Sequence, residues 1–166
     1  MKKIIKTGAV IAASILLVGC SFGKSIETTN EDTYNKVSKA VKTETVDNLQ
    51  TIDSNILLTS LGLDEKDVKD YVGKIPLYNK PEGTLYLAIK PASKSKDKVE
   101  KALDTYVSSL KSKLDVSTPD KKDDKTNSKE LEYLNNITKE EYKGYFIYVS
   151  GAKKDAILKI LKERVK

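Results

Sequence analysis

The apolar residues between positions 34 and 72 recur at the three- and four-residue spacing of amphipathic helices. Three short helices are predicted there, with apolar positions Tyr34, Val37, Ala40, Val41, Ile56, Leu57, Leu58, Leu61, Val68, Tyr71 and Val72. In the second helix, Asp53 or Ser54 is placed to cap the first turn, and Gly62 is placed to end the helix in a left-handed conformation. Asp64 and Gly73 are the corresponding start and stop signals of the third helix.

After Gly73 the spacing of the apolar residues changes from helical to alternating. Residues 84–90 alternate as a strand, with Leu85, Leu87 and Ile89 on one face. The clearest amphipathic helix of the chain follows, with apolar positions Val99, Ala102, Leu103, Tyr106, Val107, Leu110 and Leu114. Residues 116–129 are charged and carry no apolar side chain after the first, so this segment is expected to be a disordered loop.

Strand and helix signals return towards the C-terminus. A weak strand is predicted over 135–141, a tight turn at Lys143-Gly144, and a strong strand over 145–149. A closing helix is predicted over 155–165, with Ala156, Ile157, Ile160, Leu161 and Val165 facing inward. The order strand, helix, strand, strand, helix, preceded by two or three short helices, predicts an α+β domain. Its expected core is a small antiparallel or mixed sheet with helices packed on it.

The N-terminal stretch has the layout of a secretory signal. Lys2, Lys3 and Lys6 give it a positive start, and residues 8–18 form a short apolar run that ends in small residues. A helix needs roughly 20 apolar residues to cross a bilayer, so this run is too short for a permanent span. A cysteine directly after the apolar run distinguishes the stretch from an ordinary signal.

Leu17-Val18-Gly19-Cys20 resembles the lipobox of bacterial lipoproteins. The resemblance implies that residues 1–19 are removed as a signal peptide and that the Cys20 thiol carries diacylglycerol. Cys20 would then attach the protein to membrane lipid on the extracytoplasmic face, since two acyl chains hold a protein firmly where one holds it only marginally. Residues 20–32 are expected to be the lipidated cysteine and a flexible tether, and residues 33–166 a single domain.

Two further stretches resemble an uncharacterised family of small bacterial lipoproteins whose domain has no known activity. Residues 83–91 followed by 97–103 are similar to a strand and helix of that family, and residues 142–150 to its Gly-aromatic strand before the final helix. The resemblance extends from about Leu57 to Val165. The chain differs in the Lys- and Asp-rich segment 118–129, where the family is shorter and less charged. The resemblance implies the same architecture and location, and no activity.

Cysteine and histidine usage excludes several kinds of site. Cys20 is the only cysteine, so the mature domain has no disulfide, and the chain contains no histidine. The absence of histidine excludes Ser-His-Asp and Cys-His nucleophilic sites and His-ligated zinc or copper. General acid–base chemistry would need a carboxyl group or a lysine with a strongly shifted pKa.

The net charge does not indicate a nucleic-acid partner. It is +6, from 30 basic and 24 acidic residues. Loss of Lys2, Lys3 and Lys6 with the signal leaves 27 basic residues against 24 acidic ones, a net charge of +3. A nearly balanced surface of this kind is not typical of a nucleic-acid-binding protein.

Two short motifs are better explained by composition than by chemistry. Ser93 with Lys96, and Ser108 with Lys111, match the Ser-x-x-Lys of penicillin-recognising enzymes, but the Ser-Asp-Asn motif is absent and the chain is too short for that fold. The acidic residues of 120–130 lack the glycine and the alternating ligands of a calcium-binding EF-hand. We therefore predict no catalytic residue, no metal ligand and no cofactor.

Aromatic residues of the two strong strands are a candidate ligand-binding face. Tyr86 lies on the first strand, and Phe146 and Tyr148 share a face of the last strand. If the two faces coincide and remain uncovered, they form an aromatic shelf suited to a sugar, a peptide or a partner protein. The alternative is that helices cover both faces of the sheet and the three rings belong to the core.

A group of lysines around the long helix is a second candidate surface: Lys94, Lys96, Lys98, Lys101, Lys111 and Lys113. These cations could meet anionic lipid or wall polymers, whereas the interleaved Asp97, Glu100 and Asp104 are typical of an ordinary solvated helix. The predicted function is a non-catalytic binding or interaction module at the cell envelope, with an envelope protein or polymer as partner. The alternative is a cell-envelope hydrolase, which needs a cleft holding two Asp or Glu carboxyl groups within about 10 Å.

Overall fold

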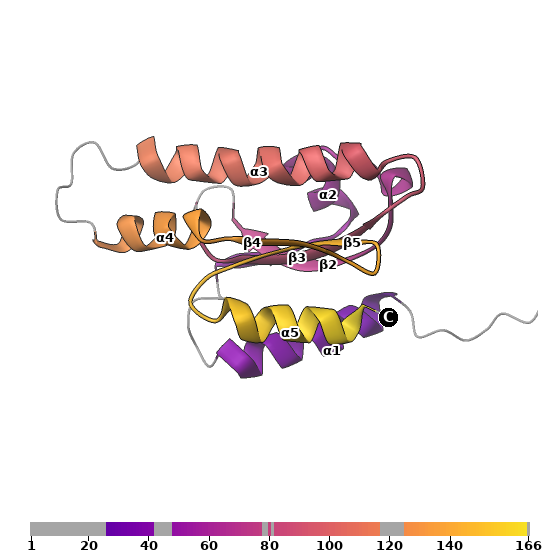
Figure 1. Cartoon of the computed structure of the whole chain (residues 1–166), viewed down its shortest axis with the longest axis horizontal. Coiled ribbons are helices and arrows are strands. Elements are labelled where there is room, and N and C mark those ends of the chain that lie inside the picture. The colour runs from indigo at the N-terminus through magenta and orange to yellow at the C-terminus, as the bar shows by residue number, and fades with distance from the viewer. Residues whose placement is uncertain (1–25, 42–47, 78–79, 81, 117–124, 166) are drawn as a thin grey trace, which may run out of the picture.

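An antiparallel sheet lies between two layers of helices in the computed structural model, which describes residues 26–41, 48–77, 80, 82–116 and 125–165 (Figure 1). The elements in chain order are α1 (Ile26–Val41), β1 (Leu49–Thr51), α2 (Ser54–Leu61), the 3-10 helix η1 (Glu65–Asp67), β2 (Val68–Pro76), β3 (Leu85–Pro91), α3 (Lys96–Val116), α4 (Lys125–Asn135), β4 (Thr138–Tyr142), β5 (Tyr145–Ser150) and α5 (Lys154–Arg164). The predicted α+β class is confirmed.

The sheet has the strand order β1-β2-β3-β5-β4, and every neighbouring pair is antiparallel. The sheet is therefore antiparallel, not mixed. Strands β4 and β5 are joined by the predicted tight turn, in which Lys143 and Gly144 both have positive φ values, 51° and 78°. Two consecutive residues of this kind match the right-handed twist of a hairpin, which explains the Lys-Gly sequence there.

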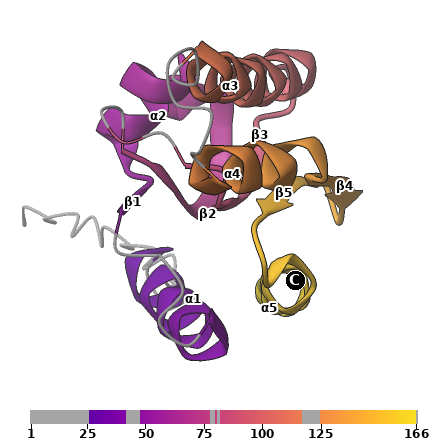
Figure 2. The same cartoon turned by 90° about the vertical axis from the view of Figure 1, so that its left-hand side faces the viewer.

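Both faces of the sheet are covered (Figure 2). Helices α2, α3 and α4 cover one face, where the core contains Leu85, Leu87 and Ile89 of β3. Helices α1 and α5 cover the other face, where Tyr86 and Ala88 of β3 are buried. The central strands β3 and β5 therefore carry apolar residues on both sides, as expected for strands without a solvent-exposed face.

The helical region begins earlier than predicted. Helix α1 starts at Ile26, inside the segment 20–32 that was expected to be a tether, so the folded domain does not begin at residue 33. Asn30 and Thr33 are buried, and the Asn30 side chain donates a hydrogen bond to the Tyr71 carbonyl oxygen at 3.0 Å. The polar composition concealed this contact, because hydrogen bonding to distant residues allows polar side chains to be buried. Residues 20–25 lie outside the described residues.

The charged segment 116–129 is also shorter than predicted as a loop. Helix α4 begins at Lys125, and residues 117–124 lie outside the described residues. Leu134 is fully buried and Leu131 packs against the same core, so two leucines three residues apart hold this helix on the sheet. Because α4 extends to Asn135, the predicted weak strand begins later, at Thr138.

The predicted third helix is wrong. After the single turn of η1, residues 68–76 form strand β2, and β1 is a short strand that the pattern did not indicate. Val72 packs in the core under α1 and α5, whereas Tyr71 and Ile75 pack on the opposite side, which is the alternation of a strand. Val68, Tyr71 and Val72 happen to fit helical spacing, and pairing with β1 and β3 decides between the two structures.

The predicted capping of α2 is confirmed, and it gives a testable prediction. Asp53 Oδ1 accepts a hydrogen bond from the Ile56 amide at 2.7 Å, and Gly62 ends the helix with φ of 66°. Asp53→Ala is expected to lower the free energy of unfolding by about 1 kcal/mol, measured by urea denaturation, because the amide loses its acceptor. Asn55→Ala, on the exposed surface of the same helix, is the control. An equal loss in the control would contradict a specific capping role for Asp53.

Candidate functional site

The predicted aromatic shelf does not exist. Tyr86, Phe146 and Tyr148 are only 1%, 5% and 3% exposed. Phe146 pairs with Ile89, and Tyr148 with Leu87, so both rings lie on the α3 side of the sheet. The Tyr86 ring lies on the α1–α5 side, so the faces do not coincide. The alternative interpretation, that the three rings belong to the core, is correct.

Tyr148 instead helps to hold α3 on the sheet. Its hydroxyl donates to Asp104 Oδ1 at 2.9 Å, and Lys139 Nζ lies 2.5 Å from the same oxygen. The hydrogen bond from Lys139, with that from Tyr148, outweighs partial burial and lowers the pKa of Asp104. Asp104 therefore stays ionised and is unsuited to act as a general acid.

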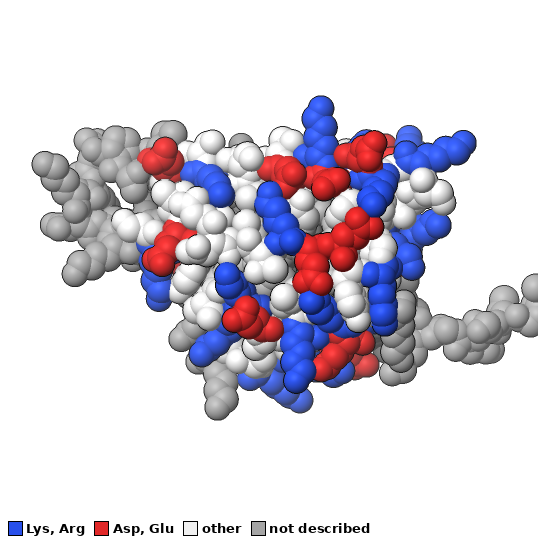
Figure 3. All heavy atoms as spheres, viewed as in Figure 1, with Lys and Arg blue, Asp and Glu red and all other residues white. Residues whose placement is uncertain are grey.

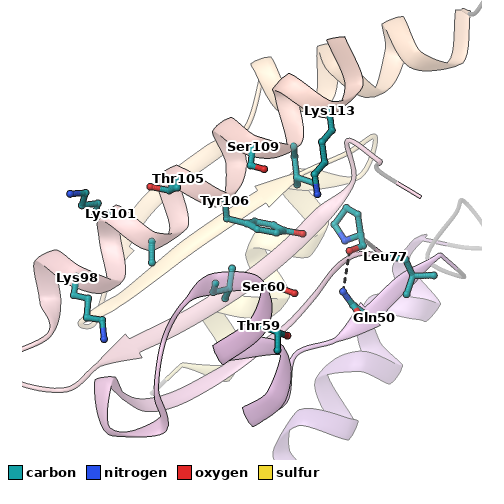
Figure 4. Close-up of a pocket in the computed structure, with 14 residues that line it drawn as sticks. Gln50, Thr59, Ser60, Leu77, Lys98, Lys101, Thr105, Tyr106, Ser109 and Lys113 are labelled. Atoms are coloured by element: carbon teal, nitrogen blue, oxygen red, sulfur yellow. Dashed lines mark hydrogen bonds between the residues drawn. The ribbon is translucent and has the colours of Figure 1, made fainter. Parts of the chain in front are cut away.

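A cleft of about 450 Å³ lies between α3 and α2, beside the ends of β1 and β2 (Figure 4). We call it the α3 cleft. Its apolar lining consists of Leu61, Pro76, Leu77, Ala102, Tyr106 and Leu110. Its polar lining consists of Gln50, Thr59, Ser60, Lys98, Lys101, Thr105, Ser109 and Lys113. Among the described residues, no Asp or Glu lines this cleft, so its charged groups are all basic.

Tyr106 is the side chain that crosses the α3 cleft. Its ring extends from α3, and its hydroxyl points to the end of the cleft where Lys113 and Gln50 also lie (Figure 4). Burial raises the pKa of the Tyr106 hydroxyl, and this hydroxyl makes no hydrogen bond to any residue that the structure describes. The side chain as a whole is only partly buried, and among the described residues its hydroxyl is not one of the polar atoms that are both fully buried and unpartnered, so it is reachable from the cleft. It is therefore available to a molecule there.

The predicted lysine group divides between different environments. Lys98, Lys101 and Lys113 line the α3 cleft, whereas Lys96 forms an ion pair of 2.8 Å with Glu141. Lys98 is itself paired with Asp67, so part of its charge is already compensated. Over the face seen in Figure 3, basic and acidic side chains are intermixed. The outer surface of α3 is thus an ordinary solvated face, and only its cleft side has one sign of charge.

Two groups of carboxylates bear on the hydrolase alternative: Asp97, Glu100 and Asp104, which line a second hollow along α3, and the pair of Glu82 with Glu130. Burial, with a smaller contribution from the charge of Glu130, raises the pKa of Glu82, and a hydrogen bond from Asn48 at 2.6 Å opposes the rise. Glu130 Oε2 accepts a hydrogen bond from the Gly83 amide at 2.6 Å. Both carboxylates thus join segments that are distant in the sequence, and neither lines the α3 cleft.

Within the described part of the chain, no group of three or more Cys, Asp or Glu side chains is arranged to hold a metal ion. Of the helices in that part, none is both long enough and apolar enough to cross a bilayer. The predicted signal peptide 1–19 and Cys20 lie outside the described residues.

Comparison with protein-family models, with curated proteins and with solved structures finds no match for this chain. The resemblances to bacterial lipoproteins therefore stay predictions that rest on the residues quoted for them.

Proposed function

We propose that the chain is a lipid-anchored protein of the extracytoplasmic membrane face, and that its domain is a non-catalytic binding module with the α3 cleft as ligand site. The lining of this cleft is the observation that carries the proposal. It combines an apolar surface with a few polar groups, which is typical of small-molecule sites. It contains no carboxyl group among the described residues, so the acid and base of a hydrolase are lacking there.

The start of α1 limits how far the domain can lie from the membrane in this proposal. Five residues separate Cys20 from Ile26. Even fully extended, that stretch of chain reaches only about 20 Å. Helix α1 covers the face of the sheet opposite the α3 cleft (Figure 1). The start of α1 and the ligand site are thus on different sides of the sheet.

The anchor is tested by Cys20→Ser. The expected result is complete loss of the acyl mass from the protein and of its partition into membranes at the processed mass, because a serine hydroxyl cannot form the thioether. Intact-mass spectrometry of the membrane and soluble fractions is the measurement, and Ser21→Ala is the matched control. A Cys20→Ser protein that still partitions into membranes at the processed mass would contradict the proposed anchor.

A further inference from the structure

We infer that the α3 cleft binds a small anionic amphiphile, with its carboxylate or phosphate at the Tyr106–Lys113 end and its hydrocarbon body along the apolar lining. The inference rests on the proposed function and specifies the ligand of that site. Three observations support it: the sign of the charge in the cleft lining, the unpartnered hydroxyl of Tyr106, and the row of apolar side chains along α3.

The charge of the cleft favours an anion over a cation. Lys98, Lys101 and Lys113 are its charged lining residues in the described part of the chain. Lys98 is paired with Asp67, and Lys101 also borders the acidic side chains Asp97, Glu100 and Asp104 along α3. Among the described residues, no carboxylate enters the lining of the cleft itself. A concave surface lined by one sign of charge raises the local concentration of counter-ions. A cationic ligand would find no counter-charge in that lining.

Tyr106 supplies the specific contact. An anionic oxygen at the end of the cleft would accept a hydrogen bond from the Tyr106 hydroxyl and interact with the Lys113 ammonium, whose side chain points to the same end (Figure 4). Hydrogen bonds to an ionised acceptor are about twice as strong as those between neutral groups. The hydroxyl has no protein partner among the described residues, so a ligand would not have to displace one.

The apolar lining accounts for the body of the ligand. Leu61 of α2 is buried, and Ala102 and Leu110 lie along the same side of α3. The apolar lining residues of α3, Ala102, Tyr106 and Leu110, follow one another at four-residue spacing over about 12 Å, at 1.5 Å per residue. A hydrocarbon chain can lie along such a row of apolar side chains. The volume of about 450 Å³ matches a small molecule and not a folded partner.

The experiment uses the protein produced in cells from the full chain, its acylation state determined by mass spectrometry, together with phosphatidylcholine vesicles and a photoreactive analogue of dodecanoate. Labelling is expected on the peptides of α2 and α3 that line the cleft. Dodecanoate and dodecyl phosphate are expected to compete with the label, whereas dodecyltrimethylammonium and inorganic phosphate are not. Tyr106→Phe is expected to raise the half-saturating concentration about tenfold, because it removes one hydrogen bond to a charged group. Tyr133→Phe, on α4 and outside the cleft lining, is the control.

A second pair of variants tests whether a negative charge placed in the cleft prevents binding. Ser109 lines the cleft at an exposed position of α3. Glu and Gln are nearly equal in size and are both good helix formers, so the two variants differ mainly in charge. Ser109→Glu is expected to abolish labelling, and Ser109→Gln to retain it. Equal labelling of the two variants, or competition by the cationic amphiphile as effective as that by dodecanoate, would overturn the inference.

The outcomes separate this inference from the proposed function. Labelling of the cleft without acylation at Cys20 would refute the anchor and leave the ligand class standing. Acylation with cleft labelling that dodecyltrimethylammonium and dodecanoate compete equally well would refute the ligand class and leave the site standing. Acylation with no cleft labelling would refute both the site and the ligand. Competition by phosphatidylglycerol added to the vesicles would identify the bilayer as the source of the ligand, whereas competition by dodecanoate alone would identify a soluble source.

Discussion

Arg164→Met is expected to lower the free energy of unfolding by about 3 kcal/mol, because it leaves the largely buried Asp70 carboxylate without its counter-charge. The Arg164 side chain is 6% exposed and that of Asp70 19% exposed. The guanidinium donates to both carboxylate oxygens, at 2.6 Å and 2.9 Å, and to Asn30 Oδ1 at 2.9 Å. Arg164 thus connects α5 to β2 and to the first turns of α1.

Two controls isolate the buried charge in urea denaturation. Lys96→Met removes one partner of a half-exposed ion pair with Glu141, for which a loss of about 0–1 kcal/mol is expected. The double variant Asp70→Asn with Arg164→Met removes both charges, so it should be more stable than Arg164→Met alone. A double variant less stable than the single one would show that lost packing, and not the unpaired carboxylate, causes the destabilisation.

The same pair predicts how stability depends on pH. Burial raises the pKa of Asp70, but hydrogen bonds from Arg164 and Tyr145 and the charge of Arg164 outweigh it, so the pKa is lowered below its usual 3.8. When the pKa of a carboxyl group is lower in the folded protein than in the unfolded protein, its ionised form stabilises the fold. That stability is fully present at a pH above the unfolded-state pKa, and it is lost as the pH falls through the folded-state pKa. The difference in unfolding free energy between the wild type and Arg164→Met should therefore narrow as the pH falls below about 4.

Local signals explain which elements the sequence predicts correctly. The apolar residues of α3 keep helical spacing over many residues, and α2 contains its own cap at Asp53 and its own end signal at Gly62. Strand β5 is an uninterrupted run of strand-forming residues. The wrong predictions concern residues whose structure is decided by contacts with distant parts of the sequence. Arg164 lies at a helix end, where charged residues are usually solvated, and the partner that buries it is 94 residues away in the sequence.

The candidate site is likewise formed by residues that are distant in the sequence. The α3 cleft combines residues of α2 and α3 with the ends of β1 and β2, and the lysines near α3 are the part of it that the sequence indicates. The helical spacing places Tyr106 on the apolar face of α3, which is correct for its ring, but whether its hydroxyl has a partner depends on which elements surround it. Likewise, strand register decides that Tyr86 and Tyr148 lie on opposite faces, and the sequence of one strand does not contain that register.

Gly73→Ala is expected to destabilise the domain by about 3 kcal/mol, because the added methyl group would have to enter the backbone of the neighbouring strand. A Cβ atom at Gly73 would lie 2.4 Å from the Tyr86 carbonyl oxygen and 2.7 Å from Leu87 Cα. These atoms belong to the paired strand β3, so they cannot move without disturbing the β2–β3 register. Gly73 therefore permits close strand pairing and does not end a helix.

Gly144→Ala separates this steric effect from the general cost of replacing a glycine. Gly144 has φ of 78°, and among the described residues no atom lies within 4 Å of the position a Cβ would take. Its replacement should cost about 1–2 kcal/mol, the strain of a left-handed alanine. Urea denaturation of both variants gives the comparison. A smaller loss for Gly73→Ala than for Gly144→Ala would show that β2 and β3 can separate enough to admit a methyl group, and that the strand pairing does not require glycine.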